Sequence, residues 1–275
     1  MKYFLYILFF TLLFGCDEVI QLDIQQVQPV IVIEGLYTNR PEKNYIKITQ
    51  TTSFYANTPP PAIQNATVTI TSTDGIVENF LPYMGTNTDS LAFYLPQTPT
   101  AGRIGEGYTL NVEVGGQIYT ASDSLYYVQP IDSLKSAIDP LAQKYPEEPG
   151  QFYQVLVFTK EPKTTKDYYL FRFYRNWVQE RSFENDIYVA DDFLLAENIN
   201  GIPSPVYYAQ NDSSVVEMYR ISRKAFVYYV DLQAVLGNDG GMFSPPPANP
   251  RNNISNNALG NFTVAAIESD TLIVQ

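Results

Sequence analysis

The stretch EGYTLNVEVGGQIYTA, residues 106–121, has the pattern of a two-stranded β-hairpin. Every second residue from Tyr108 to Val114 is apolar or aromatic, which places these side chains on one face of an extended strand. Gly115 and Gly116 can adopt the positive φ angles that a two-residue hairpin turn requires, and Ile118 begins the returning strand. The pattern predicts that this part of the chain is built from β-strands.

Similar strands are expected on the N-terminal side of this hairpin. The segment NATVTITSTDG (65–75) alternates Val68 and Ile70 with threonines and ends in Asp-Gly, a frequent turn pair. The spacing Tyr-x-Leu-x-Val, which starts at residue 108, resembles the tyrosine-corner strand of immunoglobulin-like sandwiches. With about seven short strands separated by turns, residues 29–128 are expected to form an immunoglobulin-like β-sandwich.

A change in composition marks a predicted domain boundary. Residues 129–151 interrupt the strand pattern with four prolines and an acidic pair, and they are interpreted as a linker. Residues 152–275 predict a second, β-rich domain. Within it, DYYLFRFY (167–174) places Tyr169, Phe171 and Phe173 on one face of a strand.

One helix is expected in this second domain, near residues 223–236. Ser222 is a suitable N-cap, apolar residues follow at near-helical spacing, and Gly237 is a suitable end. The final segment, NFTVAAIESDTLIVQ (261–275), is interpreted as a closing hairpin that turns at residues 268–270. The predicted fold class is therefore mainly β with one helix.

The N-terminus combines an apolar run with the only cysteine of the chain. Residues 3–14 are almost entirely apolar and would span roughly 18 Å as a helix, well short of the roughly 30 Å of a bilayer core. Residues 1–15 are therefore interpreted as a signal peptide and residues 16–28 as a polar tether. The sequence from Leu13 to Cys16 resembles a bacterial lipobox, which implies cleavage before Cys16 and lipidation of its sulfur with palmitate-type chains as the membrane anchor. An ordinary secretory signal followed by a stray cysteine is the alternative.

The composition excludes several classes of site. The chain contains no histidine, so a Ser/His/Asp triad and the usual Cys/His metal cages are excluded. The formal net charge is −12, and removal of residues 1–15, whose only charged side chain is Lys2, changes it to −13. An acidic surface of this kind repels nucleic acid. No cofactor, metal or nucleic-acid partner is expected.

Two acidic pairs, Asp191-Asp192 and Glu147-Glu148, offer carboxylates for acid and base catalysis on a glycoside. Neighbouring side chains of a strand point to opposite faces, however, so neither pair is expected to work together and no enzymatic activity is predicted. Asn238 and Asp239 offer oxygen ligands for calcium. A helix end followed by a turn explains the same two residues.

Aromatic residues are candidates for binding sugars or peptides by stacking, namely Tyr126-Tyr127, Tyr207-Tyr208 and Trp177. At most half of each tyrosine pair is expected to face a ligand, because neighbours on a strand divide between core and surface. Core packing is the alternative for each of them. The proline-rich segment 243–257 suits a docking loop, or plain connecting chain.

Several segments together resemble an uncharacterised family of Bacteroidota lipoproteins that is described only as a domain of unknown function. They are Cys16-Asp17-Glu18, PVIVIEGLYTN (29–39), NATVTITSTDG (65–75), GYTLNVEVGGQIYTASD (107–123), DYYLFRFY (167–174) and FSPPPANPRNNISNNALGNF (243–262). Their order along essentially the whole mature chain carries the resemblance. It implies an outer-membrane lipoprotein that is commonly encoded near a TonB-dependent receptor, with no established catalytic activity.

Two further features resemble signals used in the same phylum. Asp17 and Glu18, directly after the lipidated cysteine, resemble the export signal that sends lipoproteins to the cell surface. In enteric bacteria an acid at this place means retention at the inner membrane. Four Asp-Ser/Thr-Leu sequences resemble acceptors for O-glycosylation, at Ser90, Ser124, Ser133 and Thr271. Asp-Ser pairs that simply make turns before strands are the alternative.

These observations predict a non-catalytic, lipid-anchored protein of the outer membrane, exposed at the cell surface. Its expected role is that of an accessory or substrate-capture partner of a TonB-dependent transporter. A structural or adhesive spacer protein is the alternative. The sequence leaves open whether the ligand is a peptide, a sugar or a metal chelate, and it does not fix the oligomeric state.

Overall fold

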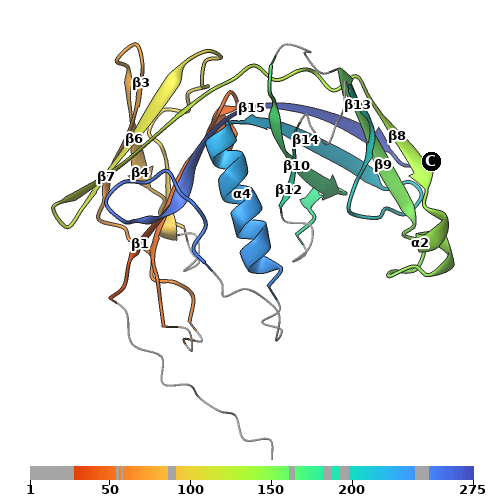
Figure 1. The fold of residues 1–275 in the computed structure, drawn as a ribbon, viewed down its shortest axis with the longest axis horizontal. Coiled ribbons are helices and arrows are strands. Elements are labelled where there is room, and N and C mark those ends of the chain that lie inside the picture. Colours follow the sequence, from red (N-terminus) through yellow and green to blue (C-terminus); the bar gives the residue numbers. More distant parts are fainter. Residues whose placement is uncertain are drawn as a thin grey trace, which may run out of the picture.

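A computed structural model describes residues 28–53, 56, 58–85, 91–160, 165–181, 187–191, 198–238 and 248–275. In these residues the chain is mainly β, as the sequence predicts, with one long helix (Figure 1). The predicted signal peptide (1–15) and all of the predicted tether (16–28) except its last residue lie outside the described residues.

The first half contains seven strands among the described residues. They are β1 (Ile31–Thr38), β2 (Tyr45–Gln50), β3 (Thr67–Ser72), β4 (Val77–Pro82), β5 (Phe93–Pro96), β6 (Gly107–Val114) and β7 (Gln117–Ser124), with the short 3-10 helix η2 (Pro41–Lys43) between the first two. The second half contains β8 (Ser133–Ile138), α2 (Pro140–Lys144), β9 (Tyr153–Lys160), β10 (Tyr168–Arg175), β11 (Val178–Gln179), β12 (Tyr188–Asp191), β13 (Asn198–Pro203), β14 (Ser213–Ile221), α4 (Arg223–Leu236) and β15 (Leu259–Ile273).

One large sheet runs through both halves of the chain. Its strand order is β11-β10-β14-β15-β1-β2-β5-β4-β3-β6-β7, and β12 also pairs with β10. A separate sheet, β13-β9-β8, lies with α2 at the right of Figure 1. The last strand, β15, joins the two halves, because it pairs in parallel with β1 and antiparallel with β14.

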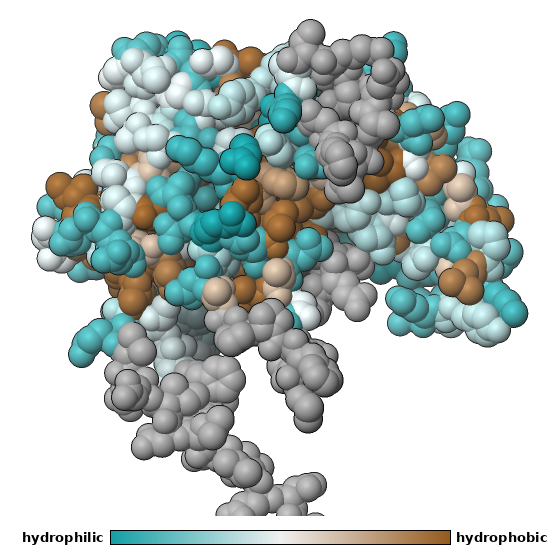
Figure 2. Space-filling view, in the orientation of Figure 1, coloured by the Kyte–Doolittle hydropathy of each residue, from teal (hydrophilic) through white to brown (hydrophobic). Residues whose placement is uncertain are grey.

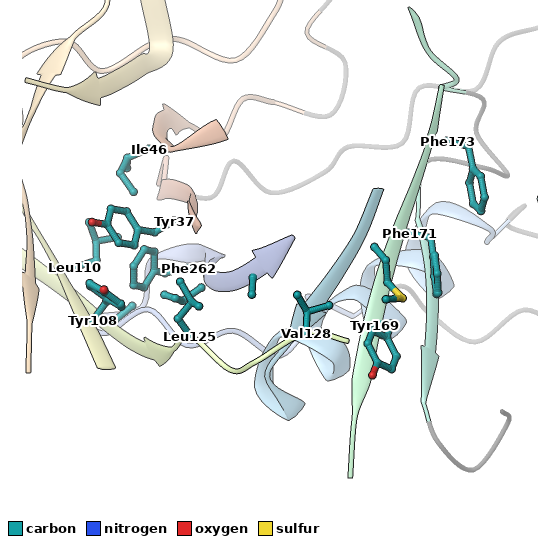
Figure 3. Packing of buried hydrophobic residues seen from close by; sticks show 14 of the residues in the cluster. Tyr37, Ile46, Tyr108, Leu110, Leu125, Val128, Tyr169, Phe171, Phe173 and Phe262 are labelled. Carbon is teal, nitrogen blue, oxygen red and sulfur yellow. The ribbon is translucent and has the colours of Figure 1, made fainter. Parts of the chain in front are cut away.

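The large sheet curls so that its edge strand β7 returns to β15. The backbone N–H of Val264 in β15 donates to the Asp123 carboxylate of β7 (3.0 Å), and the N–H of Ser255 donates to the carbonyl of Thr120 (2.8 Å). Figure 3 shows the enclosed core, where Tyr37, Tyr108 and Phe262 come together from three different strands. The curl therefore gives the first half a closed core to which the end of the chain contributes.

Helix α4 covers the opposite face of the sheet (Figure 1). Strand β15 is buried on both faces: Phe262, Val264 and Ala266 belong to the main core, whereas Ala265 and Ile267 pack in the cluster under α4. This double burial explains why its sequence is a nearly continuous apolar run, and not a simple alternation.

The two clearest elements of the sequence are confirmed. The hairpin forms as β6 and β7, with φ values of 58° at Gly115 and 77° at Gly116. The helix spans residues 223–236 as predicted, and its N-cap Ser222 accepts a hydrogen bond from the N–H of Ala225 (3.2 Å).

The predicted closing hairpin at the C-terminus is wrong. Residues 268–270 do not turn, because they lie inside the continuous strand β15, where they pair with β14. The predicted linker 129–151 contains β8 and α2. The division into two domains and the immunoglobulin-like form of residues 29–128 stay predictions, and the shared strand β15 shows that the two halves are joined in one sheet.

Candidate functional site

A pocket of about 310 Å³ opens between β3, β4 and the segment that follows β5. Its inner wall is formed by three buried side chains, Tyr37, Ile70 and Tyr108, which are between 1% and 4% exposed. At its mouth, Ile76 and Val77 are 57% and 56% exposed. The pocket therefore combines an aromatic interior with an apolar entrance.

Glu78 lines this pocket because of the alternation of β4. Val77 and Asn79 face outward, whereas Glu78 and Phe80 lie on the inward face. The phenol of Tyr37 donates a hydrogen bond to Oε2 of Glu78 (2.8 Å). The other carboxylate oxygen, Oε1, is buried and accepts no hydrogen bond from the described residues. One acceptor of the carboxylate is thus left unused.

The environment of Glu78 disfavours its charged form. Burial raises the pKa of the Glu78 carboxyl, and the side chains of Tyr37 and Thr100, which act in the opposite direction, offset only part of this effect. Burial also raises the pKa of Tyr37, and the neighbouring Glu78 adds to that shift. The phenol therefore keeps its proton and acts as a neutral donor.

Arg103 lines the same pocket, and its guanidinium is already paired with acidic side chains. Its Nη2 lies 2.5 Å from Asp74 and 3.9 Å from Glu106. Hydrogen bonds from Ser72 and then Arg103 lower the pKa of Asp74 to about 2, so this partner stays ionised. The backbone N–H of Arg103 donates to the Tyr108 hydroxyl (2.7 Å), which leaves the Tyr108 proton available as a donor.

The chemistry of the pocket suits binding. Glu78 is the one carboxylate among the described residues that line it, whereas glycoside hydrolysis by the usual mechanism uses two. The acids considered from the sequence lie elsewhere: Glu147 and Glu148 are exposed after α2, and Asp191 ends β12, while Asp192 is outside the described residues. No three His, Cys, Asp or Glu side chains gather as a metal site in the described ranges.

We expect the Glu78→Gln substitution to change how stability depends on pH. A carboxyl whose pKa is raised by folding binds its proton more tightly in the folded state, so wild-type stability falls as the pH rises from about 4.5 through the raised folded pKa. Glutamine cannot ionise. Relative to wild type, the variant should therefore be more stable at pH 7 than at pH 4, as measured by urea denaturation.

The control for this substitution is Glu113→Gln on the exposed side of β6. It makes the same change in formal charge away from the pocket. If both variants shift the pH dependence equally, the effect belongs to net charge and not to the burial of Glu78.

The residues predicted for export and modification are only partly within the described chain. Cys16, Asp17, Glu18 and Ser90 lie outside it. Of the other O-glycosylation candidates, Thr271 is exposed in β15, whereas Ser124 in β7 and Ser133 in β8 are half-buried. Asp123, which precedes Ser124, is buried and holds β7 to β15. These three positions lie in strands and not in turns, and O-glycosylation stays a prediction.

The exposure of the aromatic candidates depends on whether they follow the alternation of a strand. Tyr208 is fully buried and Tyr207 half-buried, as the alternation predicts. Tyr126 and Tyr127, however, are 44% and 57% exposed, because they follow the end of β7 and so escape strand alternation. None of these residues lines the pocket. The face shown in Figure 2 carries apolar patches between larger polar areas.

Trp177 is 73% exposed at the turn between β10 and β11. Asn176 and Trp177 have φ values of 50° and 69°, the signs of a type I′ turn, whose second position favours glycine. The turn is held by Asn176, which donates to Asp212 (2.8 Å) and accepts from the N–H of Ser213 (2.9 Å). A bulky side chain therefore occupies a left-handed backbone position in a braced turn.

Replacement of Trp177 by glycine should stabilise the fold. A left-handed conformation costs a residue with a Cβ roughly 1 kcal/mol, and glycine does not pay this cost. We expect Trp177→Gly to exceed Trp177→Ala in unfolding free energy by about 1 kcal/mol, measured by urea denaturation. The alanine variant is the control for loss of the indole ring. Equal stability of the two variants would contradict the proposed backbone strain at position 177.

Sequence reasoning missed the pocket residues Tyr37, Glu78 and Arg103. One signal was present: in VENFLP, residues 77–82, Glu78 shares the inward face with Phe80. A charged residue on the apolar side of an alternating strand marks a position where a carboxylate is partly buried. The contribution of Arg103 had no such signal, since it comes from a loop.

The described residues form a mainly β protein with a small, partly polar pocket. The chain belongs to the family described as Domain of unknown function (DUF4249), whose model matches residues 17–271. No curated protein matches the chain. Among the described residues, no helix is long and apolar enough to cross a membrane.

Proposed function

We propose that this protein is a non-catalytic lipoprotein of the bacterial outer membrane that captures a small ligand for a TonB-dependent transporter. The observation that carries the proposal is the Glu78 pocket, which has a buried aromatic interior, an apolar mouth and one unused carboxylate oxygen. Pockets of this kind bind small molecules through apolar surface and a few placed polar groups.

The arrangement of polar groups supports capture over catalysis. The phenol of Tyr37 is a protonated donor to Glu78, and the guanidinium of Arg103 is paired with Asp74. Each of these groups can fix the orientation of a ligand. None of them forms the nucleophile and base pair that covalent catalysis requires.

The membrane location is supported by the N-terminal sequence. Cys16 follows an apolar run too short to span a bilayer, in a sequence that resembles a lipobox. Membership of the domain-of-unknown-function family agrees with the resemblance on which the Bacteroidota origin and the neighbouring receptor rest. Asp17 and Glu18 favour export to the cell surface in that phylum.

Cell fractionation and mass spectrometry test the anchor. We expect the wild-type chain in the outer membrane with its N-terminus at an acylated Cys16, and the Cys16→Ser variant with an intact leader or in the soluble fraction. Since Cys16 is the only cysteine, no other thiol can substitute for it. An unmodified sulfur in the mature wild-type chain would overturn the anchor and the assigned location together.

Purification of the wild-type protein in mild detergent tests the partner. We expect a TonB-dependent receptor to copurify in a fixed ratio with the membrane-anchored chain. A chain that emerges alone under conditions that preserve other receptor complexes would overturn the docking role. That result would leave the spacer function as the better explanation.

A further inference from the structure

We propose that the Glu78 pocket takes a small organic cation, with a primary ammonium group beside the carboxylate and a short apolar substituent toward the mouth. This inference rests on the proposed function, because it names the chemical class of ligand that the capture site would bind. Three properties of the pocket lead to it: its charge, its aromatic wall and its size.

The charge of the pocket favours a cation. No ion pair joins Glu78 to a Lys or Arg among the described residues, and the side chains that favour its charged form, Tyr37 and Thr100, are themselves uncharged. The nearby cation, Arg103, already contacts the two carboxylates of Asp74 and Glu106. The negative charge of Glu78 would repel an anionic ligand. An ammonium group would instead provide the positively charged partner that the Glu78 carboxylate lacks among the described residues.

The unused hydrogen-bonding capacity of Glu78 also favours a cationic ligand. Tyr37 uses Oε2, and Oε1 is buried without a hydrogen bond from the described residues. A buried acceptor of this kind is costly unless a donor reaches it. An ammonium group carries three N–H donors and no acceptor, so it matches a carboxylate better than a neutral hydroxyl does.

The aromatic wall favours a compact ligand. The rings of Tyr37 and Tyr108 are 4.7 Å apart between centroids and tilted by 50°. Their π-systems attract a cation placed within about 6 Å of a ring centre. The two residues are only 3% and 4% exposed, which leaves too little ring surface for a sugar to lie flat against either of them. An ammonium group is more compact than a sugar and needs only a small area of ring surface.

The volume of the pocket and its apolar mouth limit the size and the polarity of the rest of the ligand. About 310 Å³ lies at the low end for ligand pockets, which limits the occupant to a small molecule. Ile76 and Val77 at the mouth can cover a short alkyl chain. A primary alkylammonium compound of a few carbons therefore combines the charge, the donors and the apolar surface that the pocket accommodates.

A ligand-observed NMR titration of the full-length chain in detergent tests this assignment at constant ionic strength. The probes are n-butylammonium chloride, n-butanol and sodium butyrate, which share a four-carbon chain and differ in charge. We expect butylammonium to bind at least tenfold more tightly than butanol, and butyrate to bind more weakly than both.

Two pocket variants should change the affinity for butylammonium in opposite directions. Glu78→Gln keeps the shape and removes the negative charge, so binding should fall to the level of butanol. Arg103→Gln removes the cation at the pocket, so binding should tighten at least twofold. Glu113→Gln, which changes net charge on the outside of β6, should leave the affinity unchanged.

The outcomes separate this inference from the proposed function. Equal affinity for butylammonium and butanol, both lost when the pocket is filled by Ile70→Phe, would overturn the cation assignment and leave capture at this site standing. Butylammonium binding that is unaffected by both pocket variants would also overturn it. No saturable binding of any probe would overturn the pocket as the capture site as well.

Discussion

The Gly260→Ala variant is expected to lose at least about 4 kcal/mol of stability, and at 37 °C to be largely unfolded. Gly260 in β15 has a φ of +102° and faces Ile33 of β1 in the parallel register. A Cβ at this position would lie 2.0 Å from the carbonyl oxygen of Ile33 and 2.7 Å from its carbon. These are backbone atoms of a buried strand, so they cannot move aside as a flexible side chain can.

The consequence would spread beyond one contact, because β15 joins the two halves of the molecule. Separation of β15 from β1 would also draw Phe262 and Val264 out of the main core. Circular dichroism and urea denaturation would show a lower midpoint or a loss of the cooperative transition.

Gly116→Ala is the matched control for Gly260→Ala. Gly116 also has a positive φ, +77°, but a Cβ there would meet no atom within 4 Å. Its substitution should cost only the backbone strain of roughly 1 kcal/mol. If Gly260→Ala were no more destabilising than this control, the close approach of β15 to β1 would be incorrect.

Removal of the guanidinium of Arg220 should cost about 3–5 kcal/mol. Its Nη2 lies 2.5 Å from Oδ1 of Asp167, and the two side chains are only 8% and 6% exposed. The same group donates to the carbonyl of Lys166 (3.0 Å) and lies over the ring of Tyr126, 5.2 Å from its centroid. The Arg220→Leu variant would leave a buried carboxylate that has lost this cation, and urea denaturation measures the loss.

A double variant distinguishes loss of the ion pair from loss of packing. Arg220→Leu combined with Asp167→Leu removes both charges, and the double variant should be more stable than Arg220→Leu alone, since a buried pair replaced by apolar groups is often close to neutral. Arg220→Lys keeps the charge but loses the planar contact over Tyr126, so it should fall between wild type and Arg220→Leu. Equal losses for the single and the double variant would show that the charge pair contributes little.

Local patterns predicted individual elements well. The alternation in 106–121 and the glycine pair gave the β6–β7 hairpin, and the Ser222 cap with helical spacing gave α4 at its observed bounds. Both features depend on residues close in sequence, where backbone geometry and side-chain spacing are linked directly. The same reasoning failed for β15, because a strand buried on both faces loses its alternation and its acidic end looks like a turn.

The candidate site was much less predictable. Glu78 could be suspected from its place beside Phe80 on the inward face of β4. Its partners, however, come from β1, β6 and the segment after β5, so that the pocket exists only through pairing between distant strands. No local pattern specifies which carboxylate will meet Tyr37 or which acids will hold Arg103.

The sequence by itself determined the β class, the β6–β7 hairpin, the helix and the acidic, histidine-free character that limits the chemistry. These properties follow from residue spacing and composition. Only the tertiary structure decided that the last strand completes the first half of the chain, that Gly260 must lack a Cβ, and that Glu78 faces two tyrosines in a pocket. The physical reason is that strand pairing over more than 200 residues depends on the packing of whole surfaces, which no short segment encodes.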